Sequence, residues 1–192
     1  MRSAISTSLV IISTYVICHG LTAYLVTPVQ RIVLPEITIF ASLMYLPHGV
    51  RVLAVWFWGW RAVLPLWLGN YVATIMFTPT SVQDLTAPVF IESMTVSAVS
   101  VLLAFELFRL LGRNYYAGQS PMLNWQRLLL IGLISSLINS FGQTLVHSGI
   151  LPDVNDLPLA ATYAVGDLAG LFVCTVVLMF IFRWIRVSQP NE

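Results

Sequence analysis

Four polar side chains are predicted to lie at a common depth inside the apolar segments of this chain: Arg51, Asn70, Asn139 and Asp167. An ionisable group at that depth costs at least about 2.5 to 3.5 kcal/mol, so each is expected to face a partner or a cavity. An Arg51–Asp167 ion pair would compensate two charges that are each costly alone. The chemistry indicated is a buried polar site that binds a small ligand or holds helices together.

A polar stripe gives the sharpest pattern in the sequence. Asn139, Gln143 and His147 recur at intervals of four residues, and Ser136 and Ser140 border them. Side chains at this spacing share one face of a helix. The stripe predicts either interhelical hydrogen bonds or the lining of a ligand pocket or water channel, and the residues leave both open.

The other reactive side chains predict less. Glu92 is expected near the outer boundary, either at the mouth of the site or hydrated beside it. His48 and His147 could in principle be axial haem ligands, but no attachment motif accompanies them. Cys18 and Cys174 lie in apolar runs and are predicted to be small buried hydrophobes rather than a disulfide. Without a motif for hydrolysis or metal-assisted chemistry, we predict no enzyme and no metal site, and the cofactor is unknown.

These few residues stand out because the rest of the chain is apolar. Of 192 residues, 58% are hydrophobic and 9% are charged, and the mean hydropathy is +0.85. A soluble domain carries about a quarter charged residues. The formal net charge of +1 also argues against a nucleic-acid binder. We therefore expect an all-α integral membrane protein, with one transmembrane domain over 1–192 and no soluble domain.

A transmembrane helix needs about 20 apolar residues. By this rule we predict six spans, at approximately 4–26, 33–60, 61–77, 86–108, 127–147 and 157–182. Arginines are retained on the cytoplasmic side, and most of them border the predicted inner ends. This places both termini in the cytoplasm, with Arg61 inside and Arg31 as the exception outside.

The second span is less regular than the others, because Pro47-His48-Gly49 interrupts it. It could cross as one kinked helix, or it could form a re-entrant hairpin of two short half-helices. Irregular backbone inside a bilayer is tolerated where protein or a water-filled cavity covers it, and ligand sites are often built there. The interruption therefore adds His48 to the candidate site.

The small residues of the last span predict close packing. Gly166 and Gly170 form a GxxxG pattern around Asp167. Such a pattern lets helices approach closely. We expect it to bring the last span against the second, so that Asp167 reaches Arg51.

Two segments resemble the MASE-type membrane-associated sensor domains of bacteria. In "LPHGVRVLAVWFWGWRAVLPLWLGN", residues 46–70, the order of Gly59, Arg61, Pro65 and Leu68-Gly69 fits the opening of that family. The segment "GDLAGLFVCTVVLMF", from Gly166, is similar to the family's closing Gly-Asp-x-x-Gly helix. The resemblance implies a sensor-like fold in the bacterial inner membrane. Family members are usually longer, with about eight spans and a fused output domain, whereas about ten residues follow the sixth span here.

Two functions follow as hypotheses. The first is a sensor-like or partner-binding module in a larger membrane complex, whose partner is another membrane protein or a cytoplasmic signalling protein. The alternative is the substrate-binding subunit of a vitamin-type uptake transporter, since six spans in about 190 residues also resemble energy-coupling-factor components. That alternative predicts a small nutrient bound near Gln143 and His147. No nucleic-acid partner is expected, and the lipid bilayer surrounds the chain.

Overall fold

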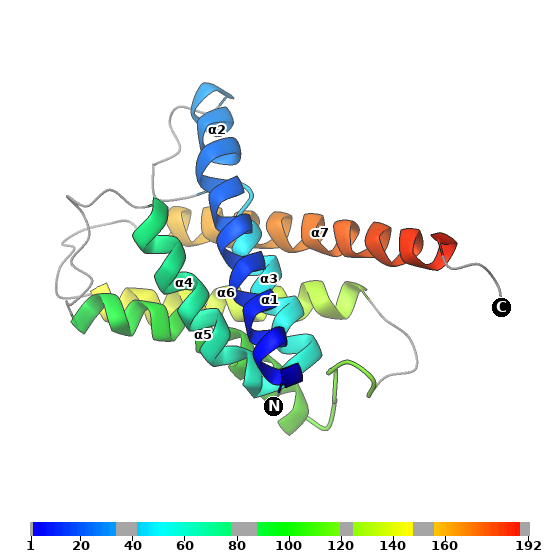
Figure 1. Ribbon diagram of the computed structural model, residues 1–192. Helices are drawn as coiled ribbons and strands as arrows, with labels where there is room; N and C mark the ends of the chain where they lie inside the picture. The colour runs from blue at the N-terminus through cyan, green and yellow to red at the C-terminus, as the bar shows by residue number, and fades with distance from the viewer. Residues whose placement is uncertain (1, 34–41, 78–87, 120–124, 148–155, 189–192) are drawn as a thin grey trace.

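The computed structural model describes residues 2–33, 42–77, 88–119, 125–147 and 156–188, and this part of the chain is all-helical (Figure 1). Five of its helical stretches are long and apolar enough to cross a membrane. They cover 4–32, 46–77, 88–110, 125–146 and 164–188. The arrangement is that expected of a multi-pass membrane protein.

The first helical rod is longer than predicted. Helix α1 (Arg2–Leu21) continues through a π-helical turn (Thr22–Val26) into α2 (Thr27–Val33), so the rod passes the predicted end at Val26 by seven residues. Pro28 explains the π turn, because its ring clashes with the carbonyl four residues earlier and it donates no hydrogen bond. The wider turn lets the helix pass this proline without breaking.

Helices α3 (Leu46–Trp58) and α4 (Val63–Phe77) form a hairpin rather than one long rod, joined by a 3₁₀ turn (Gly59–Ala62). The chain reverses at Gly59, whose φ of +59° suits a residue without a side chain. Tyr45 precedes α3 and Phe77 ends α4, yet both rings lie about 6 Å from His19 of α1, at 6.2 and 5.8 Å. The two ends of the hairpin therefore meet beside the middle of the first rod (Figure 1).

The prediction that Pro47-His48-Gly49 breaks a helix is wrong. These residues form the first turn of α3, and the irregular backbone lies just before them, at 42–45. Proline suits this position because the first N–H groups of a helix have no partner inside it. Helices α2 and α3 are therefore separate elements, and residues 34–41 lie outside the described part.

Helix α3 is the central element of the molecule. It packs against α1 on one side and α7 (Asp156–Ser188) on the other, with α5 (Pro88–Leu110) and α6 (Trp125–His147) also in contact. Helix α4 packs mainly against α1 and α5, while α5, α6 and α7 follow one another as neighbours. In Figure 1 the first rod stands upright, whereas α7 crosses the view. Most of α3 is buried, so its polar residues lie in the core.

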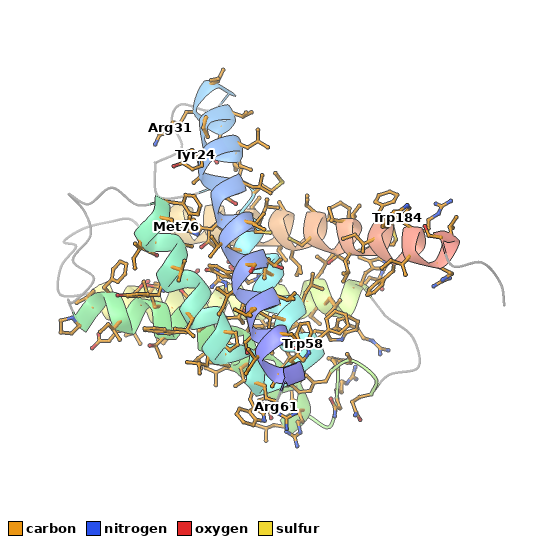
Figure 2. All side chains as sticks on the ribbon, viewed as in Figure 1. Tyr24, Arg31, Trp58, Arg61, Met76 and Trp184 are labelled. Atoms are coloured by element: carbon orange, nitrogen blue, oxygen red, sulfur yellow. The ribbon has the colours of Figure 1, made fainter. Side chains whose placement is uncertain are left out.

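Basic residues gather at the end of the molecule that holds the α3–α4 turn. Arg109 pairs with Glu106, three residues earlier on α5, at 3.1 Å. Arg113 donates to the Tyr115 hydroxyl, and the Arg127 guanidinium stacks on the Tyr115 ring. Arg61 and Trp58 lie at this same end, with Arg31 at the opposite end (Figure 2). The last turns of α7, which carry Trp184, lie apart from both.

Candidate functional site

The site begins where irregular backbone lies against α7. The Tyr45 N–H donates to the Gly166 carbonyl at 2.9 Å. A methyl group on Gly166 would overlap the Ser42 carbonyl oxygen, and one on Gly170 would overlap the Tyr45 carbonyl oxygen. The two glycines therefore admit the chain before α3, a contact closer than ordinary side-chain packing allows.

The first rod and α7 supply partners for the same backbone. The Leu46 N–H donates to Thr22 Oγ1 at 3.3 Å, and the Leu43 N–H donates to Gln30 Oε1 at 2.8 Å. The Cys174 thiol donates to the Leu46 carbonyl at 3.5 Å. Backbone groups away from water must be satisfied in this way. The non-helical chain at 42–45 is thus held between the first rod and α7, directly before α3 begins.

A histidine and a carboxylate lie together at the first turn of α3. His48 Nδ1 is 3.5 Å from Asp167 Oδ2, and the two side chains are 0% and 6% exposed. Ser136 Oγ of α6 donates to the same carboxylate oxygen at 2.6 Å. His48 Nε2 lies 3.2 Å from the Gly132 carbonyl, also of α6. The cluster therefore joins α3, α6 and α7, with Asp167 near the positive end of the α3 dipole.

The predicted Arg51–Asp167 contact is wrong, although both residues are buried in the same core. Arg51 Nη1 donates to the Ser97 carbonyl of α5 at 3.1 Å, and its guanidinium lies 5.4 Å from the centroid of the Tyr45 ring. Its charge and that of Asp167 still attract each other through the core. Arg51 lies three residues after His48, so the two side chains lie on neighbouring positions of one face of α3. Of the two, His48 is the residue in contact with the Asp167 carboxylate.

The residues of the predicted polar stripe on α6 differ in their contacts. Gln143 bonds to α5, accepting from Ser93 Oγ at 2.8 Å and donating to the Ser93 carbonyl and to Ser97 Oγ at 3.0 and 3.1 Å. These are the interhelical hydrogen bonds that the sequence allowed. Asn139 lies one turn earlier, with a buried Oδ1 that has no hydrogen-bond partner among the described residues. His147 ends α6, and its side chain lies outside the described residues.

The remaining predicted residues are not brought to the cluster. Asn70 is half-buried on α4, which packs mainly against α1 and α5. Glu92 is exposed in the second turn of α5. Ser136 was noted in the sequence only as a border of the stripe, and its spacing could have identified it as a partner. Cys18 and Cys174 are free, as predicted, but they are half-buried rather than buried.

Several buried polar atoms around the cluster lack a hydrogen-bond partner within the described part of the chain. They are His48 Nδ1, Arg51 Nε, Ser135 Oγ and Asn139 Oδ1. Such atoms are rare in folded proteins, and they often mark a bound water, an ion or a functional group. Two of these atoms belong to α3 and two to α6, so both helices carry unsatisfied polarity in the core.

Replacing Gln143 with leucine is expected to lower the free energy of unfolding by about 1 to 2 kcal/mol, since interhelical hydrogen bonds contribute about 0.6 kcal/mol each. Unfolding in mixed micelles would measure the change. Thr144→Val is the matched control, because within the described part of the chain the Thr144 hydroxyl donates to the Ser140 carbonyl of its own helix and not to α5. An equal loss in the two variants would show that the α5 contacts of Gln143 contribute nothing.

The geometry is that of a closed, charged site between helices, with no metal-binding group of histidine, cysteine or carboxylate side chains among the described residues. Comparison with known families, with curated proteins and with solved structures gave no match to this chain.

Proposed function

We propose that the chain is a non-enzymatic, sensor-like membrane module that acts through a partner protein in a larger complex. One observation carries the proposal: the His48–Asp167 pair is sealed between three helices, at the first turn of the central one. Ionisable residues enclosed in this way are costly to bury, and function is the usual reason for keeping them. The resemblance of residues 46–70 and 166–180 to MASE-type sensors supports the same role.

The ligand that suits this closed site best is a proton. The Gly132 carbonyl can only accept, so His48 Nε2 carries the hydrogen. A neutral His48 would then turn the bare lone pair of Nδ1 toward Asp167 Oδ2, 3.5 Å away. Two acceptors repel unless a proton lies between them. The pair is therefore proposed to hold one proton, carried by the imidazolium or by the carboxylic acid.

Histidine nitrogen-15 spectra of the protein in nanodiscs would test this proton. At pH 7 we expect a protonated His48 Nε2 and an Nδ1 signal that changes when Asp167 is replaced by Asn. His19 is the control, because its ring lies between Tyr15 and Phe77 rather than beside an acid. A bare Nδ1 beside an ionised Asp167 at pH 6 and 7 would contradict the proposal.

We further propose six crossings, with both termini on the cytoplasmic side of a bacterial inner membrane. Helices α3 and α4, of 13 and 15 residues, are each shorter than a full span, and the two passes proposed between residues 42 and 77 rest on the reversal of the chain at Gly59. Arg61 and Arg31 lie at opposite ends of the molecule, and the positive-inside rule places the end with Arg61 in the cytoplasm (Figure 2).

Gentle extraction followed by mass spectrometry of proteins and small molecules tests the sensor role against uptake. We expect a co-purifying protein in fixed ratio to this chain. Recovery of the chain alone would contradict a partner-dependent sensor. The uptake alternative requires Gln143 to face a nutrient, whereas this side chain bonds to α5.

A further inference from the structure

An open pocket lies at the basic end of the molecule, far along α3 from the His48–Asp167 pair. Its walls come from the end of α3, the turn at 59–62, the end of α5 and the chain that follows α5. The side chains that give it chemical character are Trp56, Trp60, Glu106, Arg109 and Tyr116. The pocket thus combines aromatic rings with one carboxylate and one guanidinium.

Local contacts build the wall that closes this pocket. The Ala117 N–H donates to the Trp56 carbonyl at 2.9 Å, which ties the chain after α5 to the end of α3. The Tyr116 ring stacks on Phe105, with centroids 4.9 Å apart. A methyl group on Gly59 would lie 3.8 Å from the same ring. The pocket is therefore anchored at both of its walls.

Two hydrogen-bond donors, from Tyr116 and Arg109, face the Glu106 carboxylate. Tyr116 donates to Glu106 Oε1 at 2.8 Å. Partial burial, and then this hydrogen bond, raise the pKa of Tyr116 well above its ordinary value, so its hydroxyl stays a donor. Arg109 reaches the carboxylate through Nη1. The side chains of Glu106 and Arg109 are 36% and 61% exposed, so both are accessible to a ligand.

The pocket carries groups that can bind a positive and a negative charge of the same ligand. An ammonium group binds favourably over tryptophan and tyrosine faces and beside a carboxylate. Arg109 uses only Nη1 toward Glu106 within the described residues, so its other N–H groups can donate to a phosphate oxygen. A ligand that carries both an ammonium and a phosphate, a few bonds apart, would satisfy both sides at once.

We infer that this pocket binds a phosphoethanolamine group, with its ammonium at Glu106 and the tryptophans and its phosphate at Arg109. A phospholipid headgroup and soluble phosphoethanolamine share this chemistry. The location favours the lipid, because exposed tryptophan beside arginine is typical of the membrane interface, and Trp58 and Arg61 lie at this end (Figure 2).

The test is lipid retention by the whole chain, reconstituted in nanodiscs of equal parts phosphatidylethanolamine and phosphatidylglycerol. Native mass spectrometry after release should show phosphatidylethanolamine retained at least about fivefold over phosphatidylglycerol, which corresponds to about 1 kcal/mol. Glu106→Gln and Trp60→Leu should each remove this preference. Trp184→Leu is the matched control, since Trp184 and Trp60 are 71% and 70% exposed and only Trp60 lines the pocket.

Each outcome decides the inference. Equal retention of the two lipids by the unmodified chain, or an equal loss in the Trp184→Leu control, would overturn it. If Glu106→Gln fails to fold, Trp60→Leu still decides, because an exposed side chain contributes little to folding. Calorimetry with soluble phosphoethanolamine separates the sources: tight binding without retained lipid would overturn the lipid as occupant. These measurements involve neither His48 nor Asp167, so their failure leaves the proposed sensor role standing.

Discussion

Replacing Asp167 with alanine is expected to lower the free energy of unfolding by about 3 to 5 kcal/mol, the usual cost of removing one partner of a buried ion pair. The change removes the acceptor of Ser136 Oγ and the carboxylate beside His48 Nδ1, and it removes a negative charge that acts on Arg51. Each of these groups is then buried with less compensation than before. Reversible unfolding in mixed micelles would measure the loss.

A double-mutant cycle identifies the partner. Asp167→Ala combined with His48→Ala should show a coupling of about 1 to 3 kcal/mol, whereas Asp167→Ala combined with Arg51→Ala should lie closer to additivity. Glu92→Ala is the control for loss of a carboxylate, since Glu92 is exposed. Stronger coupling to Arg51 than to His48 would restore the pairing predicted from the sequence.

A methyl group at Gly170 is expected to be nearly as damaging. Gly170→Ala should destabilise the fold by about 3 kcal/mol, at the upper end of overpacking costs. The added carbon would overlap the carbonyl of Tyr45, which is backbone and has no rotamer to change. Thermal unfolding in detergent would show the loss, together with a weakened His48–Asp167 contact in the histidine spectra.

Gly20→Ala separates this effect from the general cost of replacing a helical glycine. The nearest atom to a methyl group there would be the tip of the Phe77 ring, at 2.8 Å, and a side chain can move aside. Alanine also favours helix by up to about 1 kcal/mol over glycine. The variant should stay within about 1 kcal/mol of the unmodified chain. A loss equal to that of Gly170→Ala would mean that the backbone contact is not special.

Hydropathy predicts the helical class and the positions of three helices because a bilayer demands long apolar segments. The helices α4, α5 and α6 begin and end within two residues of the predicted 61–77, 86–108 and 127–147. The start of α3 was harder to place. A proline reads equally well as an interruption or as a first turn, and the choice depends on what lies beside it.

The partners within the site were less predictable than the residues themselves. Depth along a helix follows from residue counting, so Arg51 and Asp167 could both be placed in one layer. Which of them touch depends on how each helix is rotated about its axis, and that is set by packing. Gly166 and Gly170 were expected to allow close packing between two helices, but the chain that packs against them is the non-helical segment at 42–45.

The length of the first rod gives the membrane itself an influence on the site. Its 32 residues extend over about 48 Å, well beyond a hydrocarbon core of about 30 Å. Such a helix accommodates the mismatch by tilting or by projecting beyond the core, and the tilt changes with bilayer thickness. Thr22 and Gln30 hold the chain at 43–46 to this rod. A thicker or thinner bilayer would therefore shift the start of α3, which lies in the same helical turn as His48 and beside Asp167.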